Sequence, residues 1–214
     1  MVRSALSRLV RFDSEQTDGM EGEWAGVDEA GCGPLAGPVV ASAVILRDTR
    51  FLSLLNDSKK VSSQLREELY PHILQNAEVG IGVVEVEEID TLNIYHAARL
   101  AMKKAVLALS LSPCLLLIDG RGRVDLPLSQ KTVVKGDSKS ACIAAASIVA
   151  KVTRDALMVK LDQIYPQYGF KKHKGYGTAF HLARLRETGP SPAHRKSFAP
   201  VRELLSKQPY EILA

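Results

Sequence analysis

Two rhythms of hydrophobic and polar residues run along this chain, and each predicts a different kind of element. Residues 38–46, PVVASAVIL, form an almost unbroken apolar run, which is typical of a strand covered on both faces. Shorter apolar segments predict further strands at 23–28, 79–86, 114–119 and 131–134. Apolar residues at helical spacing predict helices at 62–75, at 93–109 and from near Ser138 onward. On the helix over 93–109, we expect Arg99, Lys103 and Lys104 to remain solvated.

The order of these elements favours a mixed α/β sheet. Two strands follow each other directly, helices and further strands come next, and helices occupy the rest of the chain. We therefore expect one domain over residues 20–214, built as a mixed β-sheet flanked by helices. Its C-terminal part, from about residue 166 to 214, is expected to be a helical extension. Residues 1–19 are expected to form a basic, loosely ordered N-terminal extension.

Composition and charge indicate an ordinary globular protein, but they do not identify its function. The chain has 214 residues, of which 46% are hydrophobic and 24% charged, as in an ordinary globular domain. Because no apolar run reaches about 18 residues, we expect no membrane-spanning helix. Cys32, Cys114 and Cys142 are odd in number and far apart, which indicates free thiols in a reducing cytoplasm. The net charge of +4 permits a polyanionic partner but does not require one.

Acidic residues follow three of the predicted strands. Asp28 and Glu29 end the first, Asp119 ends the fourth, and Asp137 comes shortly after the fifth. If these strands are neighbours, the carboxylates gather at one edge of the sheet, where ligand sites of open α/β sheets commonly lie. Two carboxylates about 4 Å apart repel each other by roughly 4 kcal/mol at an effective dielectric constant near 20. A cation or a proton must relieve that repulsion.

The donor atoms of this acidic group indicate which cation it would take. Carboxylate oxygens with no thiolate or histidine nearby in sequence suit Mg²⁺ or Mn²⁺ rather than zinc. Two such ions about 3.5–4 Å apart can activate water for phosphodiester hydrolysis. A purely structural interpretation stays open at this point, because Asp137 suits a helix N-terminus and Asp119-Gly120 suits a turn.

A series of segments resembles the bacterial ribonuclease HII family. The first, G-V-D-E-A-G-C-G-P-L-A-G-P-V-V at 26–40, is similar to the opening signature of that family. The others follow in the family's order over nearly everything after about residue 20: D-S-K-K at 57–60, T-L-N-I at 91–94, L-L-I-D-G at 116–120, K-G-D at 135–137, A-A-A-S-I-V-A-K-V-T-R-D at 144–155, H-K-G-Y-G-T at 173–178 and H-R-K-S-F at 194–198. The ordered series is far more specific than any single segment. The sister family, ribonuclease HIII, differs around the first motif, and G-P-L-A-G-P favours HII.

The resemblance implies a ribonuclease H-like catalytic domain and a metal-dependent endonuclease. Such an enzyme hydrolyses the RNA-containing strand of RNA/DNA hybrids and nicks on the 5′ side of single ribonucleotides embedded in duplex DNA, as in ribonucleotide excision repair. The ends are a 3′-hydroxyl and a 5′-phosphate. Asp28, Glu29, Asp119 and Asp137 would be both catalytic and metal-binding, for two Mg²⁺ or Mn²⁺ ions. We expect a cytoplasmic monomer that binds an RNA/DNA hybrid or a ribonucleotide-containing duplex and no membrane.

The resemblance also assigns substrate contacts. Gly31, Cys32 and Gly33 match the family's ribonucleotide-sensing loop, where glycines let the backbone approach a 2′-hydroxyl closely. Tyr176 matches a tyrosine that packs against the nucleotide beside the ribonucleotide. Family members usually carry Arg where this chain has Cys32, and a thiol cannot grip a phosphate through paired hydrogen bonds. A tight turn and a half-buried tyrosine are the structural alternatives.

Basic residues offer further candidate contacts with nucleic acid. Lys59, the run 171–174 and the run 194–196 are candidates for the phosphate backbone. A merely solvated charged surface is the alternative for each of them.

Two other classes of function compete with the nuclease. A non-catalytic nucleic-acid-binding domain of the same fold would not need the four acidic residues, which are all present. A small-molecule nucleotide-binding enzyme would need a phosphate loop, but G-C-G-P-L-A-G fails the G-x-G-x-x-G spacing and no G-x-x-x-x-G-K-[ST] occurs. The sequence therefore favours the nuclease.

Overall fold

The computed structural model describes residues 2–49 and 62–207, with side chains from residue 8 onward. Its elements are α1 (Val2–Gln16), β1 (Trp24–Ala30), β2 (Val39–Leu46), α2 (Ser63–Asn76), β3 (Ala77–Val84), α3 (Val86–Leu92), α4 (Ile94–Leu107), β4 (Leu115–Asp119), β5 (Ser129–Val133), η2 (Gly136–Ser138), α5 (Ala141–Ile164), η3 (Pro166–Tyr168), α6 (Phe170–His173), α7 (Ala179–Thr188) and α8 (Ala199–Lys207). All the predicted strands are present, with ends displaced by one or two residues. The sequence pattern missed α3, and the long helix begins at Ala141 rather than near Ser138. No helix in the described ranges has the length and apolar character needed to cross a membrane.

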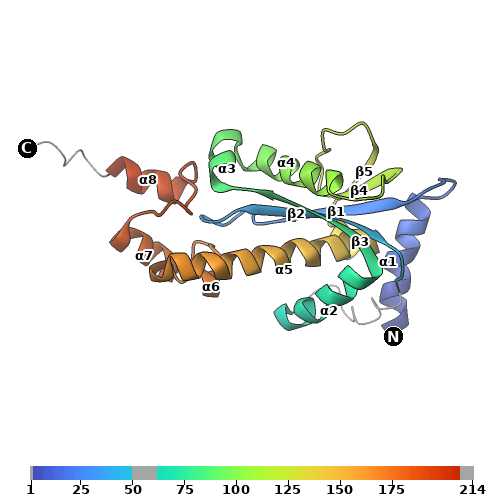
Figure 1. The fold of residues 1–214 in the computed structure, drawn as a ribbon, viewed down its shortest axis with the longest axis horizontal. Helices are drawn as coiled ribbons and strands as arrows, with labels where there is room; N and C mark the ends of the chain where they lie inside the picture. Colours follow the sequence, from blue (N-terminus) through green and yellow to red (C-terminus); the bar gives the residue numbers. More distant parts are fainter. Residues whose placement is uncertain (1, 50–61, 208–214) are drawn as a thin grey trace, which may run out of the picture.

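The strands form one mixed sheet in the order β3-β2-β1-β4-β5. The hairpin β1-β2 and the pair β2-β3 are antiparallel, whereas β1-β4 and β4-β5 are parallel. This confirms the mixed sheet flanked by helices that the element order predicted. In Figure 1, α4 covers one face of the sheet and α5 the other, with α2 and α1 beside α5.

Alternation along the strands supplies both layers of the core. Successive strand residues point to opposite faces, so Val27 packs in the cluster with Met102 of α4, while Val44 packs in the cluster with Ala145 of α5 and Ile73 of α2. β2 is buried along nearly its whole length, as expected of a strand covered on both faces.

The contact between β1 and α5 is unusually close because it involves no side chain on the strand. A Cβ added to Gly26 would lie 2.1 Å from the carbonyl carbon of Cys142 and 2.3 Å from the nitrogen of Ile143. Any larger residue at this position would push α5 away from the sheet. The glycine therefore sets the end of β1 directly against the first turns of α5.

The N-terminal segment is a helix rather than the loosely ordered lead-in that its composition suggested. Leu9 of α1 is buried in the cluster that joins α2 and α5. Asp13 Oδ2 accepts the backbone N–H of Cys142 at 3.0 Å. The first N–H groups of a helix have no partner within it, so this carboxylate satisfies one at the start of α5. Composition could not reveal the contact because it joins residues far apart in sequence.

The C-terminal helices pack on the far end of α5, where Figure 1 shows α6, α7 and α8 gathered together. Their core includes two residues of the loop after β1, Leu35 and Ala36. The buried members are Leu35, Ala36, Met158, Tyr168, Phe170, Leu185, Ala193 and Val201. The C-terminal helical part thereby holds the loop that carries the glycine motif.

Candidate active site

Adjacent parallel strands bring two of the predicted acidic residues together. In the pairing of β1 with β4, Val27 lies opposite Ile118. The next residues along the two strands are Asp28 and Asp119, which therefore lie side by side where the pairing of these two strands ends. This register brings together two of the four acidic residues that the strand-like segments indicated.

Burial makes the negative charge of Asp28 the most costly to maintain among these carboxylates. The residue is 6% exposed. Burial raises its pKa well above the ordinary value, and the negative charges of Glu29 and Asp119 raise it further. Hydrogen bonds from the N–H of Glu29, at 2.7 Å, and from Ser147 of α5 oppose that rise in pKa only in part. A nearby cation would therefore be strongly favoured.

Glu29 lies in a similar position but faces one cation. Burial raises its pKa, the positive charge of Arg99 lowers it, and the charge of Asp119 raises it again. Its Oε1 accepts a weak hydrogen bond from the thiol of Cys32 at 3.5 Å. Its Oε2 is buried and has no hydrogen-bond partner. A buried oxygen without a partner is costly, and it is the kind of atom that a divalent cation would satisfy.

Arg99 is not the solvated residue that the helical pattern predicted. It is partly buried, lies over the ring of Tyr95 at 5.5 Å, and donates from NH1 to the carbonyl of Gly122 at 2.8 Å. Its charge acts on Glu29 across the site. Helical spacing alone misplaced it because the loop after β4 folds back over that face of α4.

Asp119 and Asp137 are linked through the turn between them. Asp119 Oδ1 accepts the backbone N–H of Gly136 at 2.6 Å, which draws η2 toward the end of β4. Asp137, in η2, is exposed. It is not the helix cap considered above, because the N-cap of α5 is Ser140, whose hydroxyl accepts the N–H of Ile143. Asp137 thus lies beside the acidic group, while its carboxylate faces solvent.

The acidic side chains lie near one another, but they do not form a complete set of metal ligands in the part of the chain that the structure describes. Within residues 2–49 and 62–207, no three His, Cys, Asp or Glu side chains have the spacing needed to share one metal ion. The nature of the donors, all carboxylates, and the unpartnered oxygen of Glu29 nevertheless fit a hard divalent cation.

Two buried arginines shape the loop that follows Glu29. Arg195 donates to the carbonyls of Gly31 and Gly37, both at 2.7 Å, and Arg154 donates to Pro38 at 3.0 Å. Further bonds from these guanidinium groups reach the carbonyls of residues 32, 36, 38 and 174. We refer to residues 31–38, with their carbonyls turned toward the two arginines, as the arginine-clamped loop.

Gly31 is required at the start of the arginine-clamped loop. Its φ is +104°, which side-chain-bearing residues rarely adopt, and an added Cβ would lie 2.2 Å from Nε of Arg154. The loop is also bonded through its backbone to the C-terminal part: Leu35 N donates to Gly175 O, and Gly37 N donates to Ala193 O, both at 2.8 Å.

Tyr176 lies against the same loop. Its ring carbon Cε1 would be 3.5 Å from a Cβ added to Gly33, and the tyrosine is 46% exposed. The structure therefore brings the predicted sensing loop and the predicted stacking residue together. Cys32, between the glycines, is partly buried, and burial together with the charge of Glu29 raises the pKa of its thiol to about 12. Lys59 lies outside the described residues.

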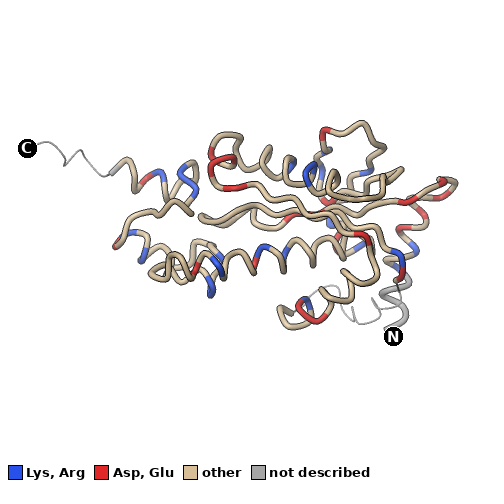
Figure 2. Tube along the Cα trace, viewed as in Figure 1, with Lys and Arg blue, Asp and Glu red and all other residues tan. Residues whose placement is uncertain are grey.

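The basic runs behave differently from one another. Figure 2 shows lysines and arginines around α6 and α7, and Lys171 and Lys172 are exposed there. His194 and Arg195 are fully buried, so the prediction that they face a duplex is wrong. Only Lys196 of that run is exposed.

Sequence reasoning missed Ser147 and Arg154, and it gave Arg195 a different role. Ser147 and Arg154 lie within a segment that carries the family resemblance, which was their only signal in the sequence, whereas Arg195 was predicted to face a duplex. Their partners are backbone carbonyls and one buried carboxylate from distant elements, which no local pattern indicates.

Comparison with known proteins decides the family. The family model described as ribonuclease HII matches residues 25–201. The chain belongs to the ribonuclease HII family. Its activity is accordingly that of a ribonuclease H, a hydrolase that cuts nucleic acid internally. The Ribonuclease HII of Bacillus licheniformis is 55% identical over 179 residues, which are 83% of this chain and 70% of that protein.

Solved structures share the fold. The ribonuclease H2 from Pyrococcus horikoshii OT3 superposes with a TM-score of 0.74 at 25% identity, over 86% of this chain and 97% of the other. Bst-RNase HIII, solved in complex with Mn²⁺, superposes with a TM-score of 0.64 at 18% identity, over 94% of this chain and 72% of the other. The ribonuclease H-like fold implied by the sequence motifs is thus confirmed.

Proposed function

We propose that this chain hydrolyses the RNA-containing strand of RNA/DNA hybrids and nicks duplex DNA on the 5′ side of single embedded ribonucleotides. The products would carry a 3′-hydroxyl and a 5′-phosphate. The observation that carries the proposal is the carboxylate group of buried Asp28 and partly buried Glu29 and Asp119, together with the loop that directly follows Glu29 in the chain, in which Gly33 lies against Tyr176. The carboxylates would provide the negative charge that binds metal ions, and the surface of Gly33 and Tyr176 would receive a nucleotide.

Asp28, Glu29, Asp119 and Asp137 would hold two Mg²⁺ or Mn²⁺ ions. When bound, such ions supply a water of lowered pKa and stabilise the charge that develops on the leaving oxygen. The raised pKa values of Asp28 and Glu29, and the unpartnered Oε2 of Glu29, support this assignment. Arg99 would limit the repulsion within the group before the cations arrive.

The arginine-clamped loop and Tyr176 would select the ribonucleotide. A 2′-hydroxyl both donates and accepts hydrogen bonds, so backbone groups of Gly31, Cys32 and Gly33 can distinguish it from a 2′-hydrogen. The ring of Tyr176 would pack against the neighbouring nucleotide, since aromatic side chains stack on any base. Lys59 and exposed lysines of α6 would contact the phosphate backbone.

The proposal includes the setting in which the chain acts. We infer a monomer in the cytoplasm that works in ribonucleotide excision repair. Free thiols at all three cysteines are consistent with a reducing compartment.

A single-ribonucleotide duplex tests the proposal directly. With Mg²⁺ or Mn²⁺ present, we expect one nick, 5′ to the ribonucleotide, and no cutting of the all-DNA duplex of the same sequence. Asp119→Asn should abolish nicking while thermal unfolding shows a folded protein. Binding without cutting by the wild-type chain, with both metals tried, would instead indicate a non-catalytic nucleic-acid-binding domain.

A further inference from the structure

Three histidines lie directly beneath the loop that carries Tyr176. His181 and His194 are fully buried, and His173 stacks on His181 with ring centroids 4.4 Å apart. Tyr168 and Phe170 enclose the cluster on its other sides, with rings within 6.5 Å of the imidazoles. None of these histidines lies among the acidic residues discussed above, so the cluster needs an explanation of its own.

A relay of hydrogen bonds runs from Ser191 through His194 and His181 to the carbonyl of Tyr176. These bonds determine which nitrogen of each imidazole carries the proton. The backbone N–H of Ser191 donates to His194 Nδ1 at 3.0 Å, so the proton of His194 sits on Nε2. That Nε2 lies 3.0 Å from His181 Nε2 and donates to it. The proton of His181 must then sit on Nδ1, which donates to the carbonyl of Tyr176 at 2.9 Å. Only uncharged imidazoles satisfy every bond in this relay.

The surroundings of the relay favour the uncharged form. Burial lowers the pKa of His194 to about 4, and burial also lowers that of His181. The titratable groups that face the relay are His173 and Tyr168, and the guanidinium of Arg154 bonds the nearby carbonyl of Lys174. If His181 gained a second proton, its Nε2–H would point at the Nε2–H of His194, and the hydrogen bond between the two rings would be lost.

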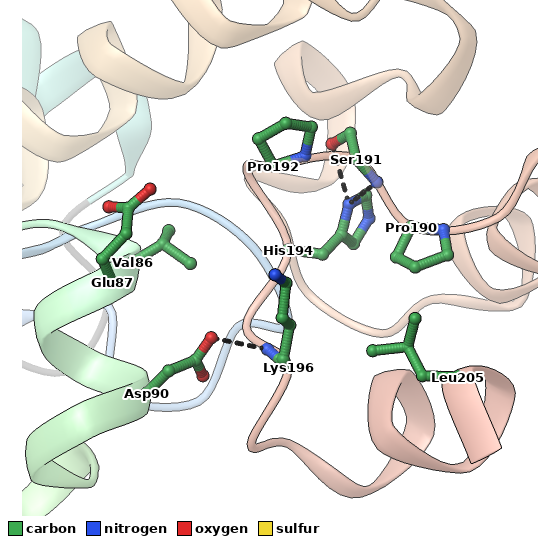
Figure 3. A pocket seen from close by; sticks show the side chains of 9 residues that line it. All are labelled: Val86, Glu87, Asp90, Pro190, Ser191, Pro192, His194, Lys196 and Leu205. Atoms are coloured by element: carbon green, nitrogen blue, oxygen red, sulfur yellow. Dashed lines mark hydrogen bonds between the residues drawn. The ribbon is translucent and has the colours of Figure 1, made fainter.

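The far end of the relay is anchored to the sheet layer through α3. Figure 3 shows Ser191 and His194 at the edge of a pocket of about 280 Å³ that Asp90 and Lys196 also line. Asp90 accepts the backbone N–H of Lys196 at 2.9 Å, and its other oxygen accepts the N–H and the hydroxyl of Ser197. These bonds hold the segment that carries His194 in place at the end of the relay farthest from Tyr176.

The near end of the relay reaches the backbone of Tyr176, whose N–H also donates to the carbonyl of His173 at 2.9 Å. The carbonyl of Tyr176 accepts from Thr178 N at 2.8 Å and from His181, while its ring stays 46% exposed. Lys174, two residues earlier, adopts a left-handed conformation with φ of 52°. The loop is therefore held by backbone bonds together with the side-chain bonds from His181 and Arg154.

We propose that His181 is a positioning residue for substrate recognition, which holds the backbone of Tyr176 so that the aromatic ring meets the nucleotide in one orientation. This inference rests on the proposed function, in which Tyr176 packs against the substrate. His181 itself touches no substrate. Its effect is exerted through the hydrogen bond from Nδ1 to the Tyr176 carbonyl.

Two matched amide variants separate positioning from simple packing. In His181→Asn the amide N–H lies near the place of Nδ1 and can still donate to Tyr176, whereas in His181→Gln the amide lies near Nε2 and reaches only His194. We expect His181→Gln to raise KM for a single-ribonucleotide duplex by about tenfold, within the range of one aromatic–base stack, with kcat within about twofold. His181→Asn should stay within about threefold of wild type in both, and so should the exposed control His72→Gln.

A double-mutant cycle with Tyr176→Ala completes the test. If His181 acts through the tyrosine, His181→Gln should raise KM no further once the ring is absent. Equal effects of Asn and Gln, or a full additional rise in the Tyr176→Ala background, would overturn the positioning role. An unchanged KM in Tyr176→Ala alone would instead contradict the proposed function. Thermal unfolding of each variant identifies any that does not fold, and in that event the cycle is run with His181→Leu.

Discussion

The molecule buries charge in two neighbouring regions, and it treats the two in opposite ways. Where the pairing of β1 and β4 ends, Asp28 is buried and Glu29 is partly buried near a third carboxylate, and one buried oxygen of Glu29 has no partner. In the arginine-clamped loop, Arg154 and Arg195 are also buried, but their guanidinium groups donate to several carbonyls each. The acidic region thus keeps a buried oxygen without a partner, whereas every guanidinium nitrogen of the arginine region bonds at least one carbonyl.

This difference indicates that the acidic region is suited to binding a ligand, whereas the arginine region supports the structure. A buried charge that lacks partners costs free energy until a ligand of opposite charge arrives, and this favours cation binding. A buried guanidinium whose nitrogens all bond carbonyls fixes the backbone around it, and its charge is already satisfied without a ligand. Removing charge should therefore stabilise the first region and destabilise the second.

The largest expected effect comes from neutralising the acidic region. Asp28→Asn removes a buried negative charge and one metal ligand, so we expect kcat to fall by at least about a thousandfold. The free energy of unfolding should rise by about 1 kcal/mol without added metal, because repulsion from Glu29 and Asp119 is lost. Urea unfolding and single-turnover cleavage measure the two effects. Asp125→Asn, at an exposed ion pair, is the control, and a less stable Asp28→Asn would contradict the comparison.

Removing a charge from the arginine region should have the opposite effect on stability. Arg195→Met leaves the carbonyls of Gly31 and Gly37 without their donor, and we expect unfolding to cost about 4 kcal/mol less. Arg195→Lys should recover only part of this, since one ammonium cannot replace the planar fork. Urea unfolding of the three proteins is the measurement. A loss below about 1 kcal/mol would show that water readily replaces the guanidinium.

Acid should weaken the histidine relay that adjoins the arginine-clamped loop. His194 has a pKa of about 4 in the folded protein against an ordinary 6.5, so the unfolded chain takes up a proton first. The contribution is fully present above pH 6.5 and is lost as the pH falls toward 4, to a total of about 3 kcal/mol. Urea unfolding across this window, with His194→Asn for comparison, isolates the effect. An equal pH dependence in both proteins would assign it to other groups.

The smallest expected effect concerns Cys32, the residue of the arginine-clamped loop whose thiol bonds Glu29 of the acidic region. Cys32→Arg introduces the guanidinium that the family usually has, beside Glu29 and the proposed phosphate path. Affinity for the ribonucleotide duplex should rise by about fivefold, with a steeper salt dependence and no large change in kcat. Fluorescence anisotropy at two salt concentrations measures it. Unchanged or weaker binding would mean that the loop leaves no room for the longer side chain.

The sequence predicted the acidic region far better than the arginine region. Asp28 and Asp119 each end an apolar segment, and parallel neighbouring strands bring such ends together, so pattern and topology agree. The family motifs also placed Tyr176 and the glycines, which lie against each other. The mixed sheet followed from the order of strands and helices alone.

Misplaced residues share one property. Arg99, His194 and Arg195 look like solvated charges in sequence, yet each bonds a group on another element or loop, which for Arg195 lies more than a hundred residues away. α1 was missed for the same reason, because Asp13 bonds the start of α5. Hydrophobic periodicity describes what a segment buries, and it carries no information on which polar groups another segment leaves unpaired.

The close contact at Gly26 has a consequence for how the site keeps its dimensions. Elsewhere in a protein core, the gap between a strand and a helix depends on the volumes of side chains, and it shifts when those are exchanged. Here main chain rests on main chain, so the gap between Asp28 on the strand and Ser147 on the helix has no spacer that can be resized. The rest of the hydrophobic interior can therefore change composition while Asp28 keeps its place against α5.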